Sequence, residues 1–147
     1  MPALAEVAPT TPTAPVPLRE GDALPTIETE PITRTQLVRY AGASGDFNPM
    51  HHDEEFATRA GMPSVFAHGL LQSGTLASVL ARWVGLANLR SYSTRFVGEV
   101  WPGDVLELNG RVDAVREAGR ERIAECSFSV AGPRGEVLRG KAAARVV

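Results

Sequence analysis

The stretch AHGLLQSGTLASVLARWV, residues 67–84, is the longest helical pattern in the chain. Apolar and small side chains surround this segment, and Gln72 and Arg82 are its strongly polar members. A helix that is apolar on nearly all sides is normally buried on all sides as well. We therefore expect one long helix at the centre of the fold.

The sequence beyond this helix changes from a helical period to an alternation of apolar and polar residues. Turns that contain glycine divide it into four segments, at residues 92–100, 104–115, 120–130 and 136–147. Strict alternation near the end of the third segment places Cys126, Phe128 and Val130 on one packed face. The pattern predicts an α+β domain in which an antiparallel sheet wraps around the long central helix.

A set of shorter elements precedes the central helix. Residues 26–32 are rich in β-branched side chains and predict a strand. Thr33 has the character of a helix cap, with Gln36 at capping-box spacing, and Gly45 ends the helix that follows. Asp53 begins a second short helix. The expected order is therefore strand, small helices, long helix and four strands.

Length and composition limit the classes of function. The 147 residues predict one domain at 18–147, preceded by a flexible tail at 1–17 that is rich in Pro, Ala and Thr. A formal net charge of -2 provides no basic field for nucleic acid, and the apolar runs are too short for a membrane helix. One cysteine excludes an internal disulfide framework and favours a cytoplasmic location.

The segment SGDFNPMH, residues 44–51, contains the residues best suited to chemistry. An Asp and a His brought together by such a turn, here Asp46 and His51, can hold a water molecule and move its protons. Asp46 and Asn48 could instead simply bond to their own backbone, as such residues often do in turns. His68-Gly69 at the start of the buried helix adds backbone N–H groups and a positive dipole end, which can polarise a carbonyl oxygen.

Other chemistries fit these residues less well. A calcium loop beginning at Asp46 would have Met50 in place of a ligand and Ala57 in place of the closing Glu. The three histidines of the chain match no strong metal signature, so no metal is expected. Ser44 does not lie in a nucleophile elbow, and Cys126 is expected to be a small core residue.

The motif YAGASGDFNPMH, residues 40–51, followed by His68-Gly69-Leu70, resembles the MaoC-like dehydratases, which include the (R)-specific enoyl-CoA hydratases. The resemblance extends from about Arg19 to the C-terminus and includes Arg95-Phe96 and the turn at residues 101–104. It implies a hotdog fold, in which a curled antiparallel sheet wraps around a long helix. It also implies a homodimer, or a heteromer with another hotdog subunit.

The resemblance further implies a reversible hydratase/dehydratase that interconverts trans-2-enoyl and (R)-3-hydroxyacyl thioesters of CoA or acyl carrier protein. In such an enzyme Asp46 and His51 would bind and activate water, and Asn48 would orient the pair. The backbone N–H of Gly69 would hold the thioester oxygen. No metal or redox cofactor is implied.

The substrate and the assembly stay open at this point. Substrate contacts are expected from His68, Phe47 and Ser73, and fatty-acid, mycolic-acid and steroid side-chain metabolism are all compatible settings. An alternative is a hotdog subunit that contributes only binding surface to a heteromeric dehydratase, although such subunits usually lack the Asp or the His. A hotdog thioesterase would need a carboxylate on or beside the long helix, and residues 67–84 contain none.

Overall fold

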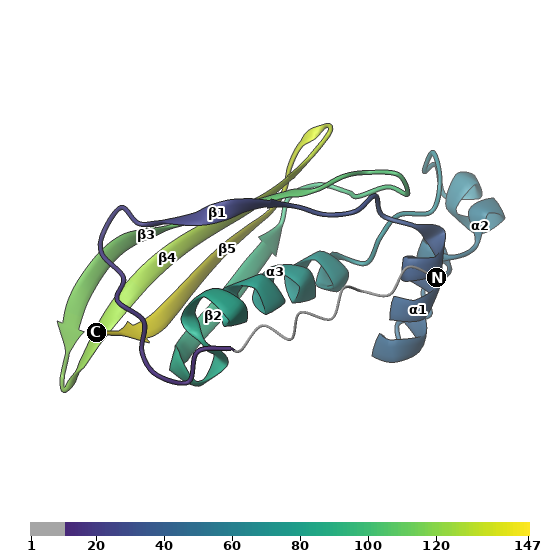
Figure 1. Cartoon of the computed structure of the whole chain (residues 1–147). Coiled ribbons are helices and arrows are strands. Elements are labelled where there is room, and N and C mark those ends of the chain that lie inside the picture. The colour runs from purple at the N-terminus through teal and green to yellow at the C-terminus, as the bar shows by residue number, and fades with distance from the viewer. Residues whose placement is uncertain (1–10) are drawn as a thin grey trace.

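The fold consists of one antiparallel sheet with a long helix lying along its face (Figure 1). The computed structural model describes residues 11–147. The sheet has five strands in the order β1-β3-β4-β5-β2, so β1 and β2 are its edges. The strand bounds are β1 Ala23–Glu28, β2 Leu89–Phe96, β3 Glu107–Ala118, β4 Glu121–Gly132 and β5 Gly135–Val146. The α+β architecture expected from the sequence is confirmed.

The helices also follow the expected order. Their bounds are α1 Arg34–Ser44, η1 Pro49–His51, α2 Glu54–Arg59, α3 Gly69–Val84 and η2 Leu86–Asn88, where η marks a 3₁₀ turn. The capping box is confirmed, because the Gln36 N–H donates to the Thr33 hydroxyl at 3.1 Å and the Thr33 N–H donates to the Gln36 side chain at 2.7 Å. α1 and α2 lie beyond one end of the sheet (Figure 1). No helix within residues 11–147 is long and apolar enough to cross a membrane.

The bounds of β1 and β2 differ from the expected ones, because pairing with neighbouring strands determines where these two strands begin and end. β1 begins at Ala23, which pairs with Arg111, and β2 begins at Leu89, which pairs with Ala144. β2 ends at Phe96 because the next two N–H groups, at residues 97 and 98, both turn to the carbonyl oxygen of Val137, at 3.0 and 3.3 Å. These partners are distant in sequence, so a local pattern does not contain them.

The core lies between α3 and the inner face of the sheet. Leu76 and Leu80 of α3 are fully buried, and Cys126, Phe128 and Val130 face inward as expected. Burial raises the pKa of the Cys126 thiol to about 11, which leaves it a protonated core residue. Phe128 is in register with glycines on both flanking strands, Gly110 and Gly140, and its ring lies over Gly110. Trp83 of α3 meets this ring edge-on, with centroids 6.3 Å apart.

The segment before β1 contacts the far end of α3. Asn88 is fully buried, and its side-chain nitrogen donates to the carbonyl oxygens of Ala14, at 2.9 Å, and Val84, at 2.8 Å. Val16 forms a parallel bridge with Val146. Residues 11–17 of the expected tail therefore lie against the domain, and residues 1–10 of that tail lie outside the described residues.

Replacing Gly85 with Ala is expected to lower the free energy of unfolding by about 2–4 kcal/mol, because a Cβ in a left-handed backbone is strained and a backbone clash is added. Gly85 has φ +83°, and a Cβ there would overlap the carbonyl oxygen of Pro12. The matched control is Gly119→Ala, with φ +66° and open space around it, which should lose only about 1 kcal/mol. Urea denaturation measures both variants, and equal losses would contradict the contact with Pro12.

Candidate active site

The loop between α1 and η1 is shaped by short local hydrogen bonds. Gly45 ends α1 in the left-handed conformation, with φ +74°. The Ser44 hydroxyl donates to the carbonyl oxygen of Tyr40 at 2.7 Å and accepts from the N–H of Asp46 at 3.2 Å. Asp46 in turn accepts from the N–H of Asn48 at 3.2 Å. These bonds hold the Asp46 side chain at the start of the loop.

Asn48 closes the same loop. Its side-chain oxygen accepts from the N–H of Met50 at 3.1 Å and thereby caps η1, with Pro49 as the first residue of that turn. The local bonding of Asp46 and Asn48 is the arrangement that a simple turn would also show. What distinguishes this turn is its last residue, His51, which is only 8% exposed.

His51 is held as a neutral imidazole with one nitrogen free. Its Nδ1 lies 2.7 Å from the carbonyl oxygen of Phe66, so Nδ1 carries the proton and donates it. The other nitrogen, Nε2, is then an acceptor. Burial lowers the pKa of His51 below its ordinary value of 6.5, and the neighbouring His68 acts in the same direction. The group is therefore a proton acceptor at neutral pH.

His68 makes the reciprocal contact from the other segment. It is 2% exposed and precedes α3, and its Nε2 lies 3.1 Å from the carbonyl oxygen of Asp46. Its ring lies against that of His51, with centroids 3.8 Å apart and planes 31° apart, and the centroid of the Tyr40 ring lies 5.0 Å from its own. Each histidine thus bonds to a backbone carbonyl of the other's segment, an arrangement that we call the histidine clasp (His51–Phe66 and His68–Asp46).

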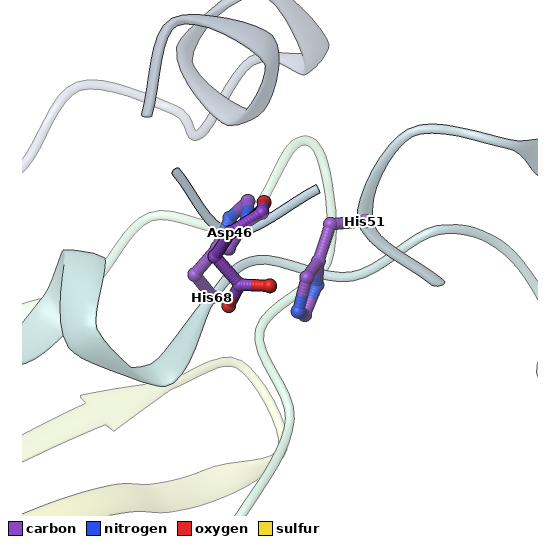
Figure 2. Close-up of side chains that lie close together, drawn as sticks. All are labelled: Asp46, His51 and His68. Atoms are coloured by element: carbon purple, nitrogen blue, oxygen red, sulfur yellow. The ribbon is translucent and has the colours of Figure 1, made fainter. Parts of the chain in front are cut away.

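The clasp gathers three titratable side chains (Figure 2). One carboxylate oxygen of Asp46 and one ring nitrogen each of His51 and His68 lie within 4.8 Å of one another. Figure 2 shows the Asp46 carboxylate directed toward the His51 ring. These groups are donor types that a transition metal accepts, and the two imidazole rings are tilted by 31° relative to each other. A carboxylate beside a neutral imidazole is suited to holding and deprotonating water.

α3 begins directly beside this cluster. Its first residue is Gly69, and no side chain of residues 11–147 caps its N-terminus. The first N–H groups of a helix lack partners within the helix, and the dipole there is positive. A Cβ on Gly69 would lie 3.0 Å from the Phe96 ring, which is tighter than ordinary contact, so glycine is what allows Phe96 to pack there. A cavity of about 360 Å³ adjoins Gly69 and Phe96.

A buried aspartate holds the strand connection that supports the start of α3. Asp104 is 5% exposed, accepts from the N–H of Trp101 at 2.8 Å and pairs with Arg134. The turn that it stabilises carries Val100, whose carbonyl oxygen accepts from the N–H of Ala67 at 2.8 Å. The segment that leads into His68 and Gly69 is thereby anchored to the sheet.

The structure brings together some of the expected site residues and not others. Asp46, His51, His68 and Gly69 converge, and Asn48 caps the turn between the first two. Phe47 is 65% exposed and lies outside the cluster. Ser73 is buried on α3, but its hydroxyl already shares hydrogen bonds with Tyr92, at 3.2 Å, and Thr94, at 3.1 Å.

Four groups belong to the site or line its cavity but were not predicted as site residues from the sequence: Tyr40, the carbonyl oxygen of Phe66, Gln72 and Phe96. The one with a sequence signal was Gln72, a strongly polar residue in a helix of mostly apolar and small residues. A backbone carbonyl carries no sequence signal at all, and the ring contacts join residues far apart in the chain.

The comparisons with known proteins agree with this fold and these motifs. The family described as "MaoC like domain" matches residues 17–128. The 3-hydroxybutyryl-CoA dehydratase of Methylorubrum extorquens is 34% identical over 118 residues, which cover 78% of this chain and 73% of that protein. Fatty acid synthase beta subunit TOXC of Cochliobolus carbonum is 39% identical over 72 residues, or 47% of this chain. The match covers only 4% of that much longer subunit.

Among solved structures, the (R)-hydratase from A. caviae involved in PHA biosynthesis superposes with a TM-score of 0.77. The match covers 88% of this chain and 98% of that chain at 23% identity. Likeness at this identity shows a shared fold, and it confirms the hotdog architecture expected from the sequence.

The His51 imidazole is expected to titrate with a pKa below 6.5, because burial disfavours its charged form. NMR of the ring C–H signals across pH measures this value, with the His51 signal assigned by its loss in His51→Gln. Since the unfolded chain binds the proton more readily, this group's contribution to stability is complete above pH 6.5 and is lost as pH falls through the folded pKa. A measured His51 pKa of 6.5 or above would contradict the buried neutral state.

Proposed function

Because the chain belongs to the MaoC-like dehydratase domain family, we propose that it is an (R)-specific hydratase/dehydratase of enoyl thioesters, a hydro-lyase. The observation that carries the proposal is the meeting of the Asp46 carboxylate and the neutral His51 beside the N-terminus of α3. The dehydratase activity named for the Methylorubrum extorquens relative supports the same reaction class.

In the proposed reaction, a water molecule is held by Asp46 and by Nε2 of His51. His51 accepts a proton as the water oxygen bonds to C3 of the trans-2-enoyl group, and the acid form of the pair then delivers a proton to C2. Water is thus added across the double bond, and dehydration is the reverse. The bond from His51 Nδ1 to Phe66 supports this role, because it fixes the tautomer that leaves Nε2 free.

Conjugate addition places negative charge on the thioester oxygen, and Gly69 is proposed to receive it. Its backbone N–H stands at the positive end of α3, a helix of 16 residues. A fixed N–H donor aimed at a developing charge lowers the barrier without reorganisation. Asn48 is proposed to act indirectly, by capping the turn that carries His51.

Asp46→Asn and His51→Ala are each expected to lower kcat/KM for crotonyl-CoA hydration by about 10²–10⁴-fold, the usual contribution of a general acid or base. The wild-type product is expected to be (R)-3-hydroxybutyryl-CoA, which chiral chromatography identifies. An (S)-product would remove the stereochemical assignment.

Neighbouring residues provide matched controls for this pair. His52→Ala removes the adjacent histidine, which is exposed, and Asp53→Asn makes the same acid-to-amide change at the cap of α2. Both controls should keep near-normal turnover. If Asp46→Asn and His51→Ala also kept near-normal turnover in the folded, active assembly, the proposal would be wrong.

Gly69→Ala is expected to lower kcat/KM by about 10–10³-fold, because the added methyl group crowds the N–H that is proposed to bind the oxyanion. The control is Gly74→Ala on the same helix, where a Cβ meets nothing within 4 Å. That change should stabilise α3 by about 0.5–1 kcal/mol and leave kcat/KM unchanged. Steady-state kinetics measures the effect on catalysis, and thermal unfolding measures the effect on stability. Equal kcat/KM of the two variants would argue against Gly69 as the donor to the oxyanion.

The alternative, a subunit that works only within a heteromer, has one observation in its favour. Among the described residues β2 pairs only with β5, so one side of this edge strand is available to another chain. Apolar side chains are exposed in the segments next to that edge: Leu70, Phe96 and Val97. We propose that β2 joins a second hotdog subunit. Size-exclusion chromatography with activity of the chain alone supports a homodimer, whereas activity only with a second subunit supports the heteromer.

The acyl group is proposed to be carried by CoA or by acyl carrier protein. Assays across enoyl-CoA chain lengths, including a bulky sterol thioester, and with the matching carrier-protein thioesters, distinguish fatty-acid, mycolic-acid and steroid side-chain substrates. No metal or redox group enters the proposed reaction, since the carboxylate, the imidazole and the backbone N–H account for every proton and charge that moves.

A further inference from the structure

His68 is a buried titratable side chain that the proposed reaction does not use. It precedes α3 and is 2% exposed. Its Nε2 lies 3.1 Å from the carbonyl oxygen of Asp46, whereas its Nδ1 is buried and has no hydrogen-bond partner among residues 11–147. Buried polar atoms in native proteins nearly always have a partner, so an unpaired one calls for an explanation.

The contacts of the two ring nitrogens favour one protonation state of His68. A carbonyl oxygen can only accept, so the proton lies on Nε2 and is donated to Asp46. A second proton on Nδ1 would create a buried cation whose new N–H meets no acceptor within the described residues. These contacts therefore favour a neutral ring with a bare Nδ1, which is the reverse of the tautomer of His51.

The charged and titratable groups that face the His68 ring favour the same state. They are the Asp46 carboxylate, the His51 ring and the Tyr40 ring. The carboxylate accepts from the N–H of Asn48, and neither of its oxygens bonds to Nδ1 of His68. In the proposed reaction His51 becomes a cation, and a second cation with its ring centroid 3.8 Å away would repel it.

The hydrogen bond from His68 also determines where Asp46 lies. Within its own loop, Asp46 donates its N–H to Ser44 and accepts from the N–H of Asn48. Among the described hydrogen bonds, only the one from His68 reaches Asp46 from outside this loop. It ties Asp46 to the segment that begins α3, while Figure 2 shows the Asp46 carboxylate directed toward the His51 ring.

We infer that His68 is a positioning residue, which as the neutral Nε2–H tautomer holds the Asp46 carboxylate against His51 and leaves His51 as the base of the site. The inference rests on the proposed function, since that function assigns water activation to Asp46 and His51. His68 thus acts through these two residues, a role that differs from the substrate contact expected for it. Its loss should therefore change kcat rather than KM.

The test variants are His68→Met, which has no donor, and His68→Gln, whose amide N–H can replace Nε2–H as the donor to Asp46. His68→Met is expected to lower kcat for crotonyl-CoA hydration by about 10–10²-fold with KM nearly unchanged, because small displacements of reacting groups cost this much. His68→Gln should restore most of the lost kcat. The matched control is His52→Met, which removes a ring whose Nε2 lies 3.1 Å from the carbonyl oxygen of Phe47. That ring is exposed, so kcat should not change.

Nitrogen NMR tests the tautomer independently of activity. A two-bond ¹H–¹⁵N correlation spectrum at pH 7 should show His68 with a protonated Nε2 and a bare Nδ1, and His51 with the reverse. Each set of signals is assigned by its loss in the corresponding Gln variant. A cationic His68, or one with its proton on Nδ1, would overturn the inference.

The kinetic outcomes are equally decisive. Wild-type kcat in folded His68→Met contradicts the inference, and so does a raised KM at unchanged kcat, which indicates direct contact with the substrate. Equal losses of kcat in folded His68→Met and His68→Gln contradict it as well. If His68→Met fails to fold in thermal unfolding, the NMR tautomer and a near-wild-type kcat of His68→Gln decide. Failure of the proposed function differs from all of these, because wild-type protein then hydrates no crotonyl-CoA while the tautomer is still observed.

Discussion

The burial of α3 against the inner face of the sheet is the constraint on which the rest of this molecule depends. The buried side of the helix packs against the sheet through Leu76 and Leu80, and Phe128 of the sheet lies over Gly110 on the neighbouring strand. A buried helix still begins with N–H groups that lack partners. The loop residues, the cavity and the edge of β2 all gather at that N-terminus, beside Gly69.

Two short segments, residues 44–51 and 66–69, are joined there by the histidine clasp. His51 bonds to the carbonyl oxygen of Phe66, and His68 bonds to that of Asp46, so each segment fixes the other. Because the acceptors are backbone atoms, the clasp constrains the path of the chain as well as the ring orientations. It keeps the proposed water-binding pair at a constant place relative to the N-terminus of α3.

Much of the fold follows from local signals. The capping box at Thr33, the left-handed Gly45 and the alternation around Phe128 each depend on residues within a few positions, so sequence patterns predict them well. The starts of β1 and β2 were misplaced by about three residues, because Arg111 and Ala144 on other strands determine them. Substrate contacts from Phe47 and Ser73 stay predictions: Phe47 is 65% exposed, and the Ser73 hydroxyl shares a hydrogen bond with Tyr92.

The sequence alone determined the elements and the kinds of chemical group available: a buried helix, four alternating strands, and a turn with an Asp, an Asn and a His. Only the tertiary structure decided which nitrogen of His51 is free, that His68 is buried, and that the Gln72 amide bonds to the backbone of the first residues of α3. The physical reason is the distance along the chain over which each effect acts. Periodicity and capping act within a few residues, whereas burial, tautomer and hydrogen-bond satisfaction depend on atoms that only folding brings together.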